Sequence, residues 1–145
     1  MLDITQTRTY IFSSDKDTRS QQENQTEYLK AEQLLKQYGF TPLKTFGKYQ
    51  GRTEDCFLVS VDSRSEWEIQ LLETLIFDKL QQDALIYQGQ AGTYVLKQVT
   101  YSPEIAGYVF THSRSTRAKL EDPPARPETD HTYIPHKGKF LYLEF

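Results

Sequence analysis

The chain has 145 residues, a net charge of −3 and one cysteine, Cys56. This length fits a single domain, 1–145, and the weakly negative charge argues against a nonspecific nucleic-acid binder, which needs a basic surface. One cysteine cannot form an internal disulfide, and no basic segment followed by an apolar run marks a signal peptide. No apolar stretch is long enough to cross a membrane. We therefore expect one soluble domain in the cytoplasm, with no nucleic-acid or membrane partner.

Hydrophobic periodicity predicts alternating strands and helices along the chain. In chain order we expect a strand over 7–12, a helix that starts near Ser20 and stops at Gly39, a strand over 40–46, a turn over 47–51, a strand over 54–61, a helix from Ser63 or Ser65 to Leu80, and strands over 82–87, 94–99, 105–110 and 140–145. Capping-box pairs mark both helix starts, Ser20 with Glu23 and Ser65 with Glu68. Trp67 is expected on the apolar face of the second helix.

The order of these elements predicts the fold class. Strand, helix, strand, strand, helix, strand is the order of a ferredoxin-like α+β domain, with two helices on one face of an antiparallel or mixed sheet. Extra strands follow at the C-terminal end. Between them, residues 112–138 hold four of the six prolines. We expect this segment to be a long irregular excursion from the domain.

Several kinds of catalytic site are poorly supported by the sequence. It has no GxSxG elbow, no Walker loop and no GxGxxG turn. Cys56 lies inside a predicted strand and is expected to be a packed thiol. The three histidines, His112, His131 and His136, do not have the spacing of a zinc site, which needs three or four ligands. No metal or cofactor is therefore expected.

Glu54 is the residue that most strongly suggests chemistry, because it begins the most apolar predicted strand. Alternation divides this strand between two faces: Asp55, Phe57, Val59 and Val61 on one, and Glu54, Cys56, Leu58 and Ser60 on the other. The first face is the more apolar, so we expect it to pack under the helices. Glu54 then begins the face that the helices leave open to a ligand or a second subunit. A solvated acid at a strand end is the simpler interpretation of the spacing alone.

Three further polar residues are placed where they can join Glu54. Gln82 and Asp83 stand between the second helix and the next strand. A strand–helix–strand connection makes the flanking strands parallel, so Glu54 and Gln82 are expected at the same edge of the sheet. Tyr49, between two glycines of the predicted turn, has a ring that can face a sulfonium or ammonium group. The ordinary alternatives are that Gln82 and Asp83 cap the helix and strand, and that Tyr49 covers the sheet end.

Residues 26–87 resemble the bacteriophage S-adenosylmethionine (SAM) lyases, formerly called SAM hydrolases. The resemblance rests on the helix that ends at Tyr38 and Gly39, the run GKYQGRTE that ends at Glu54, the amphipathic second helix, and the segment QDALIY that begins at Gln82. The closing FLYLEF is a looser likeness. The loop before Glu54 differs from the family pattern, and the proline-bearing segment has no counterpart in it.

The resemblance implies a reaction without metal or cofactor. The carboxylate of SAM attacks the substrate's own γ carbon, which gives homoserine lactone and methylthioadenosine. The implied active-site glutamate is Glu54, and the implied substrate-binding pair is Gln82 and Asp83. We expect Tyr49 to complete the catalytic set by contacting the cationic sulfur. The family also implies a homotrimer with sites between subunits, made by a phage in the host cytoplasm, where loss of SAM counters restriction.

Two other functions are compatible with the sparse inventory of catalytic residues. One is a non-catalytic interaction or inhibitor protein that grips a host partner with the open sheet face or the proline-rich segment. The other is a domain that senses SAM and turns nothing over. Substitutions at Glu54 and Gln82 separate the first from an enzyme, and SAM binding without consumption identifies the second.

Overall fold

The computed structural model describes residues 7–49, 51–82, 84–89, 92–102, 107–115, 117–121, 131–135 and 139–144. The elements in chain order are β1 (Thr7–Ser13), α1 (Gln21–Gln37), β2 (Leu43–Tyr49), β3 (Arg52–Asp62), α2 (Glu66–Thr74), the π-helix η2 (Leu75–Lys79), β4 (Ala84–Gly89), β5 (Gly92–Ser102), β6 (Gly107–Ser115), β7 (Arg117–Glu121), β8 (His131–Ile134) and β9 (Lys139–Glu144). The predicted α+β class is confirmed. No helix in the described part of the chain has the length and apolar character needed to cross a membrane.

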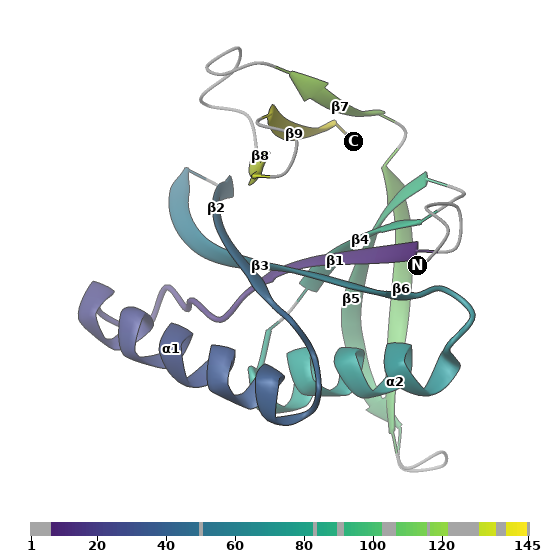
Figure 1. Ribbon diagram of the computed structural model, residues 1–145, viewed down its shortest axis with the longest axis horizontal. Helices are drawn as coiled ribbons and strands as arrows, with labels where there is room; N and C mark the ends of the chain where they lie inside the picture. The colour runs from purple at the N-terminus through teal and green to yellow at the C-terminus, as the bar shows by residue number, and fades with distance from the viewer. Residues whose placement is uncertain are drawn as a thin grey trace.

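The described strands form one sheet in the order β6-β5-β4-β1-β3-β2-β8-β9-β7. Every pair of neighbours in it is antiparallel. Helix α1 connects β1 to β2, which lie on either side of β3 in the sheet. Helix α2 with η2 connects β3 to β4, which lie on either side of β1. Both helices lie in one layer on the same side of the central strands (Figure 1).

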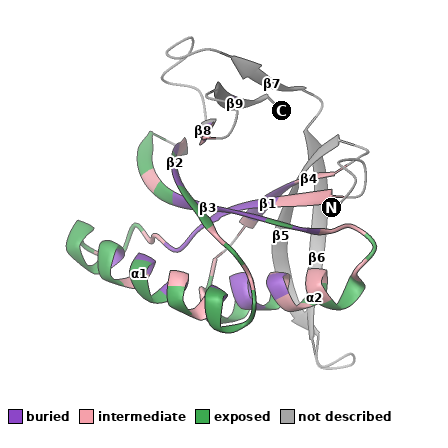
Figure 2. Cartoon of the chain, viewed as in Figure 1, coloured by how far each residue is buried: buried purple, intermediate pink, exposed green. Residues whose placement is uncertain are grey.

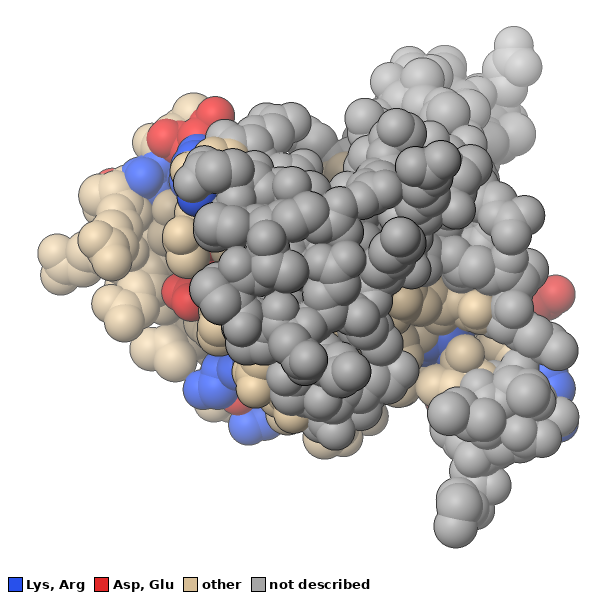
Figure 3. Space-filling view, turned by 90° about the horizontal axis from the view of Figure 1, so that it is seen from above, with Lys and Arg blue, Asp and Glu red and all other residues tan. Residues whose placement is uncertain are grey.

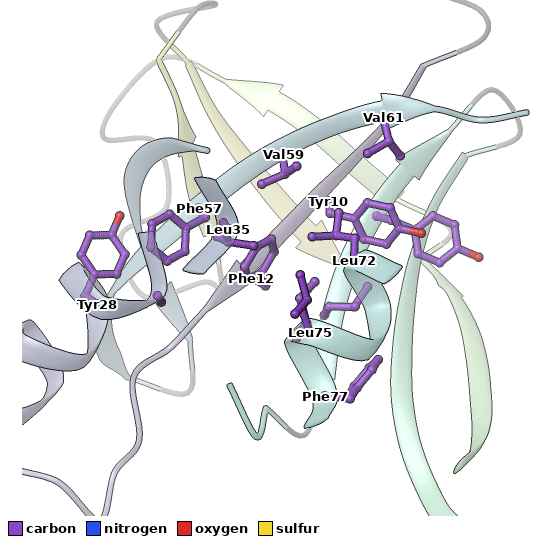
Figure 4. Packing of buried hydrophobic residues seen from close by; sticks show 14 residues of the cluster. Tyr10, Phe12, Tyr28, Leu35, Phe57, Val59, Val61, Leu72, Leu75 and Phe77 are labelled. Atoms are coloured by element: carbon purple, nitrogen blue, oxygen red, sulfur yellow. The ribbon is translucent and has the colours of Figure 1, made fainter. Parts of the chain in front are cut away.

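The main hydrophobic core lies between the helices and the central strands. Tyr28 of α1 stacks on Phe57 of β3 with ring centroids 4.3 Å apart, and Phe12 of β1 lies 5.6 Å from the same ring. Val59 and Val61 continue this face of β3 beneath α2 (Figure 4). The predicted alternation along β3 is therefore confirmed, with its more apolar face under the helices.

The opposite face of the sheet has a second core, because the sheet curls. One cluster of buried residues joins strands that are far apart in the strand order: Ile11 of β1, Leu58 of β3, Ile86 of β4, Ile134 of β8 and Leu141 of β9. Four strands separate β4 from β9 in the sheet, so their side chains meet only if the sheet bends, and Figure 1 shows β8 and β9 turned over the central strands. The expectation of an open face is wrong at Leu58, which is 4% exposed.

The first helix follows its sequence signals closely. The Ser20 side chain accepts from the Glu23 backbone N–H at 3.1 Å, and the Glu23 carboxylate accepts from the Ser20 N–H at 3.2 Å. Gly39 has a φ of 91°, the left-handed conformation that ends a helix and that glycine adopts without strain. Figure 2 shows buried residues on the sheet side of α1 and exposed residues outside.

The second helix departs from its predicted start and apolar face. Ser65 is the N-cap, but its side chain makes no capping bond, so the predicted pairing with Glu68 is absent. Trp67 is 67% exposed and lies in the first turn. Ile69 and Leu71 are partly buried and pack against the core, and the fully buried residues follow at Leu72, Leu75 and Ile76. Trp67 therefore lies on the exposed side of a helix whose first turn already contacts the core through Ile69.

Two loop predictions are wrong. The glycine-bracketed segment 47–51 was expected to be a turn, yet β2 runs to Tyr49, and Gly47 lies within the sheet. Gly47 pairs with Glu54 on one side and with Thr132 of β8 on the other, an arrangement that leaves no room for a turn. The expected irregular excursion 112–138 contains the end of β6 and all of β7 and β8. Residues 122–130 and 136–138 within it lie outside the described part.

Charged side chains of both signs lie next to one another at the margins of the view from above (Figure 3). An ion pair connects β2 to α1, because Lys44 Nζ lies 3.3 Å from Glu32 Oε1. Within α1, Lys36 Nζ lies 3.5 Å from the other oxygen of the same carboxylate. Exposed pairs of this kind contribute roughly 0–1 kcal/mol each. They orient the helix on the sheet more than they stabilise the domain.

Tyr10 is the polar link between β1 and α2. Its hydroxyl donates to Glu73 Oε2 at 2.6 Å and accepts from Arg8 Nη1 at 3.2 Å. Arg8 also lies over the Tyr87 ring, 4.6 Å from its centroid. Burial, followed by the bond to Glu73, raises the pKa of Tyr10, so the hydroxyl stays protonated and remains a donor.

Replacing Tyr10 by Phe is therefore expected to lower the free energy of unfolding by about 1–3 kcal/mol, because Glu73 loses its buried donor while the ring remains. Urea unfolding of the variant and the wild type measures the difference. Tyr38→Phe is the matched control, since Tyr38 is exposed at the end of α1. An equal effect of both substitutions would contradict this account of the Tyr10 hydroxyl.

Candidate functional site

The candidate site lies at the end of the sheet where β1 stops and β3 begins. Strand β1 is antiparallel to both β3 and β4, so β3 and β4 run in the same direction. Glu54, near the start of β3, and Gln82, two residues before β4, therefore lie at the same end of the sheet, as the sequence predicted. Glu54 does not begin its strand, however, because β3 starts at Arg52.

Glu54 is half-buried and has an unusual neighbour across the ladder. Its Cα partner on β2 is Gly47, so β2 contributes no side chain beside Glu54 at that position. On the same face of β3, Cys56 follows and is buried. The predicted packed thiol is confirmed, and burial raises the pKa of Cys56 well above its ordinary range.

Two of the predicted site residues fall at the limit of what the structure describes. Tyr49 is the last residue of β2 and pairs with Arg52 through the backbone, and its side chain lies outside the described part. Asp83 also lies outside the described residues. Glu54 and Gln82 are the two predicted site residues whose side chains lie within the described part.

Asp15 is a site residue that the sequence did not predict. It lies two residues beyond the last β1 pair, Ser13 with Cys56, as Glu54 lies two residues before that pair on β3. Asp15 Oδ2 accepts from the backbone N–H of Asp55 at 3.3 Å. Its own backbone N–H donates to the Ser13 hydroxyl at 2.9 Å, and that hydroxyl donates to the Asp55 carbonyl at 2.6 Å. The carboxylate is thus fixed against the start of β3.

Gln82 reaches the same place from the helix side. Its side-chain Nε2 donates to the backbone carbonyl of Asp15 at 3.3 Å and to that of Leu80 at 3.4 Å. Asp15 therefore links the two parts of the site: its carboxylate is hydrogen-bonded to β3, and its backbone carbonyl is hydrogen-bonded to Gln82. The sequence signal for this residue is an acid shortly after the first strand. That signal indicates a site residue only when the pairing of β1 with β3 is known, because the pairing brings Asp15 to the start of β3.

The π-helix η2 sets the position of Gln82. The Leu80 N–H donates to the Leu75 carbonyl at 2.9 Å, and the Gln82 N–H donates to the Ile76 carbonyl at 3.2 Å. Gln81 between them has a φ of 52°, a left-handed conformation that costs energy for any residue except glycine. Its side chain accepts from Lys16 Nζ at 3.0 Å. Wide helical turns and left-handed residues of this kind recur at functional sites.

Burial is the main reason that the pKa of the Cys56 thiol is raised. After burial, the charges of Glu54, Asp15 and Asp55 are the causes that raise the pKa of Cys56. The pKa of Asp15 is itself raised, first by burial and also by the charge of Asp55, while the hydrogen bond from the Asp55 backbone N–H, Arg52 and Arg19 act in the opposite direction. This end of the sheet therefore combines three carboxylates with the guanidinium groups of Arg52 and Arg19.

The raised pKa of Asp15 predicts how stability depends on pH. The folded protein binds this proton more tightly than the unfolded chain, whose pKa is near 3.8, so folding is favoured by protonation. As the pH falls through the folded pKa toward 3.8, the wild type is expected to gain stability relative to Asp15→Asn. Urea unfolding between pH 7 and about pH 3.5 measures this. Asp17→Asn, an exposed acid in the same loop, is the control and is expected to show no such gain.

Metal ligands and known relatives give no further indication of the chemistry. Among the described residues, no group of three or more His, Cys, Asp and Glu side chains is placed to hold a metal ion. The backbones of His112 and His131 lie in β6 and β8, whereas His136 lies outside the described part. The chain matches no model of a known protein family, and no curated protein matches it.

Proposed function

We propose that this protein cleaves S-adenosylmethionine to methylthioadenosine and homoserine lactone. The observation that carries the proposal is that Glu54, Asp15 and Gln82 lie at one end of the sheet, where Asp15 is hydrogen-bonded both to Gln82 and to the residue after Glu54. Glu54 and Gln82 are the residues that the likeness to SAM lyases assigns to the site. The carboxylates around them suit a substrate with a sulfonium and an ammonium group.

The reaction needs little chemistry from the protein. An oxygen of the SAM carboxylate forms a bond to the γ carbon while the bond from that carbon to sulfur breaks, and its electron pair goes to sulfur. The carboxylate and sulfonium charges disappear together, and no proton moves. Such a step is favoured by holding the substrate folded and by excluding water, since separated charges are better solvated than the neutral products.

Glu54 in this mechanism orients the substrate and takes no proton. Its carboxylate holds the ammonium or the sulfonium, and the Gln82 amide contacts the substrate from the helix side. Tyr49 and Asp83 complete the site, Tyr49 with its ring against the cationic sulfur. A hydrolase would instead use Glu54 as a general base toward water, and homoserine would then form directly.

The proposal extends to the fold and the assembly. The order β4-β1-β3-β2 with two crossing helices supports a ferredoxin-like core to which β5 to β9 are added. The active form is a homotrimer with sites between subunits, working in the cytoplasm of a host cell. Its biological effect is to lower host SAM and so to counter restriction.

The decisive experiment is incubation of the purified protein with SAM in the presence of a chelator, followed by mass spectrometry. Methylthioadenosine with homoserine lactone appearing before homoserine supports the lyase, and homoserine without lactone supports the hydrolase. If SAM survives at high protein concentration, the enzyme is excluded. Calorimetry then separates a SAM sensor, which binds SAM, from an interaction protein, which does not.

A further inference from the structure

Asp15 holds its carboxylate where an uncharged side chain would serve the local structure as well. That carboxylate accepts a hydrogen bond from the backbone N–H of Asp55 through Oδ2. An asparagine oxygen accepts the same bond and carries no charge to desolvate. The other oxygen, Oδ1, is buried without a hydrogen-bond partner among the described residues, and so is the hydroxyl of the preceding Ser14, which is 2% exposed. Buried oxygens without a donor are rare in folded proteins, and each calls for an explanation.

The surroundings of Asp15 make its charge still less favourable for folding. Burial and the charge of Asp55 on β3 raise its pKa, and the hydrogen bond from the Asp55 backbone N–H, together with Arg52 on β3 and Arg19 in its own loop, offsets them only in part. The Arg19 guanidinium is occupied by the Ser14 carbonyl, to which Nη1 donates at 3.1 Å. A negative charge kept at such a position indicates a purpose other than stability.

We propose that Asp15 is a further positioning residue of this site, which holds Gln82 beside β3 and makes the site prefer a sulfonium to a neutral thioether. The inference rests on the proposed function and names the residue that gives it charge specificity. The Asp15 carbonyl accepts from the Gln82 amide, and the Asp15 carboxylate is hydrogen-bonded to the backbone N–H of Asp55, the residue after Glu54 on β3. A cation bound there supplies the positive charge that the carboxylates lack.

The test compares two ligands that differ in this one charge. S-adenosylmethionine carries the sulfonium, and S-adenosylhomocysteine carries a thioether in its place. For Asp15→Asn we expect the affinity for S-adenosylmethionine to fall about tenfold and that for S-adenosylhomocysteine to change less than about twofold. The KM for S-adenosylmethionine is expected to rise in parallel. Asp17→Asn removes the same charge from an exposed place in the same loop and is expected to leave both affinities unchanged.

Each outcome decides the matter. If Asp15→Asn weakens both ligands equally, Asp15 is only structural and the inference is wrong; it is also wrong if neither affinity changes. Should Asp15→Asn fail to fold, Asp15→Glu replaces it, which keeps the charge and is expected to retain the preference for the sulfonium. If the wild type itself neither binds nor cleaves S-adenosylmethionine, the proposed function fails, and this inference fails with it.

Discussion

Replacing Glu54 by Gln is expected to lower kcat/KM for S-adenosylmethionine by about a hundredfold or more, the usual loss when one electrostatic contact to the reacting group is removed. The substitution keeps the size of the side chain and removes its charge. Glu54 is half-buried and lies opposite Gly47, so its replacement alters little packing on β2. Initial rates of methylthioadenosine formation, measured by chromatography over a range of substrate concentrations, give the value.

The matched control for this substitution is Glu66→Gln. Glu66 is an exposed glutamate in the first turn of α2, and α2 begins where β3 ends, at the opposite end of the sheet from Glu54. It is expected to retain wild-type kcat/KM, with a small loss of stability from the helix N-terminus. If Glu54→Gln were as active as Glu66→Gln, Glu54 would have no part in the reaction.

Replacing Phe57 by Ala is expected to lower the free energy of unfolding by about 3–5 kcal/mol, which is a large part of the roughly 5–15 kcal/mol of a typical domain. The Phe57 side chain is 0% exposed, and its ring contacts both the Tyr28 and the Phe12 rings. Truncation leaves a cavity between α1, β1 and β3 that these two rings can fill only in part. Urea unfolding followed by circular dichroism measures the loss.

Two further variants make this result interpretable. Phe57→Leu keeps much of the volume and is expected to lose less, so the pair gives a graded response even if the alanine variant is largely unfolded. Phe46→Ala removes a ring that stacks on Tyr133 but is 43% exposed, and its cost is expected to be below about 1.5 kcal/mol. Equal losses for Phe46→Ala and Phe57→Ala would contradict the position of the core.

The features that the sequence predicts well are those decided by neighbouring residues. The capping box of Ser20 and Glu23 and the stop at Gly39 depend on a few consecutive residues and are found as expected. The two faces of β3 follow from simple alternation, and the structure confirms them at Phe57 and Val59. The common edge of Glu54 and Gln82 follows from the direction that a helical crossover imposes on its two strands.

The features that the sequence predicts poorly are decided by residues that are distant from them in the sequence. Gly47 was expected in a turn because glycine favours turns, yet it is held in β2 by pairing with Thr132 of β8. Strand β8 itself looked irregular in the sequence, because its partners β2 and β9 are remote or follow it. Trp67 was expected on the apolar face of the second helix because it is apolar, but it is 67% exposed while Ile69 packs on the core.

Asp15 illustrates the same limit within the candidate site. In the sequence it is one of several polar residues after the first strand, with Asp17 as its near equivalent. What distinguishes the two is the register of β1 on β3, which brings Asp15 to the backbone of Asp55. That register depends on packing across the whole sheet, so a one-dimensional pattern does not reveal it.

The pairing of β2 with β8 also constrains how the chain reaches its native state. Thr45 donates to the carbonyl of Tyr133, 88 residues later, at 2.6 Å. Contacts of such high sequence separation require a long loop to close and slow the search for the native topology. A nascent chain that has emerged only through β6 can bury the helix side of its sheet, while β2 still presents a bare edge to other chains. We therefore expect refolding yields to fall as protein concentration rises, and translation of the last strands to be the step that ends this vulnerability.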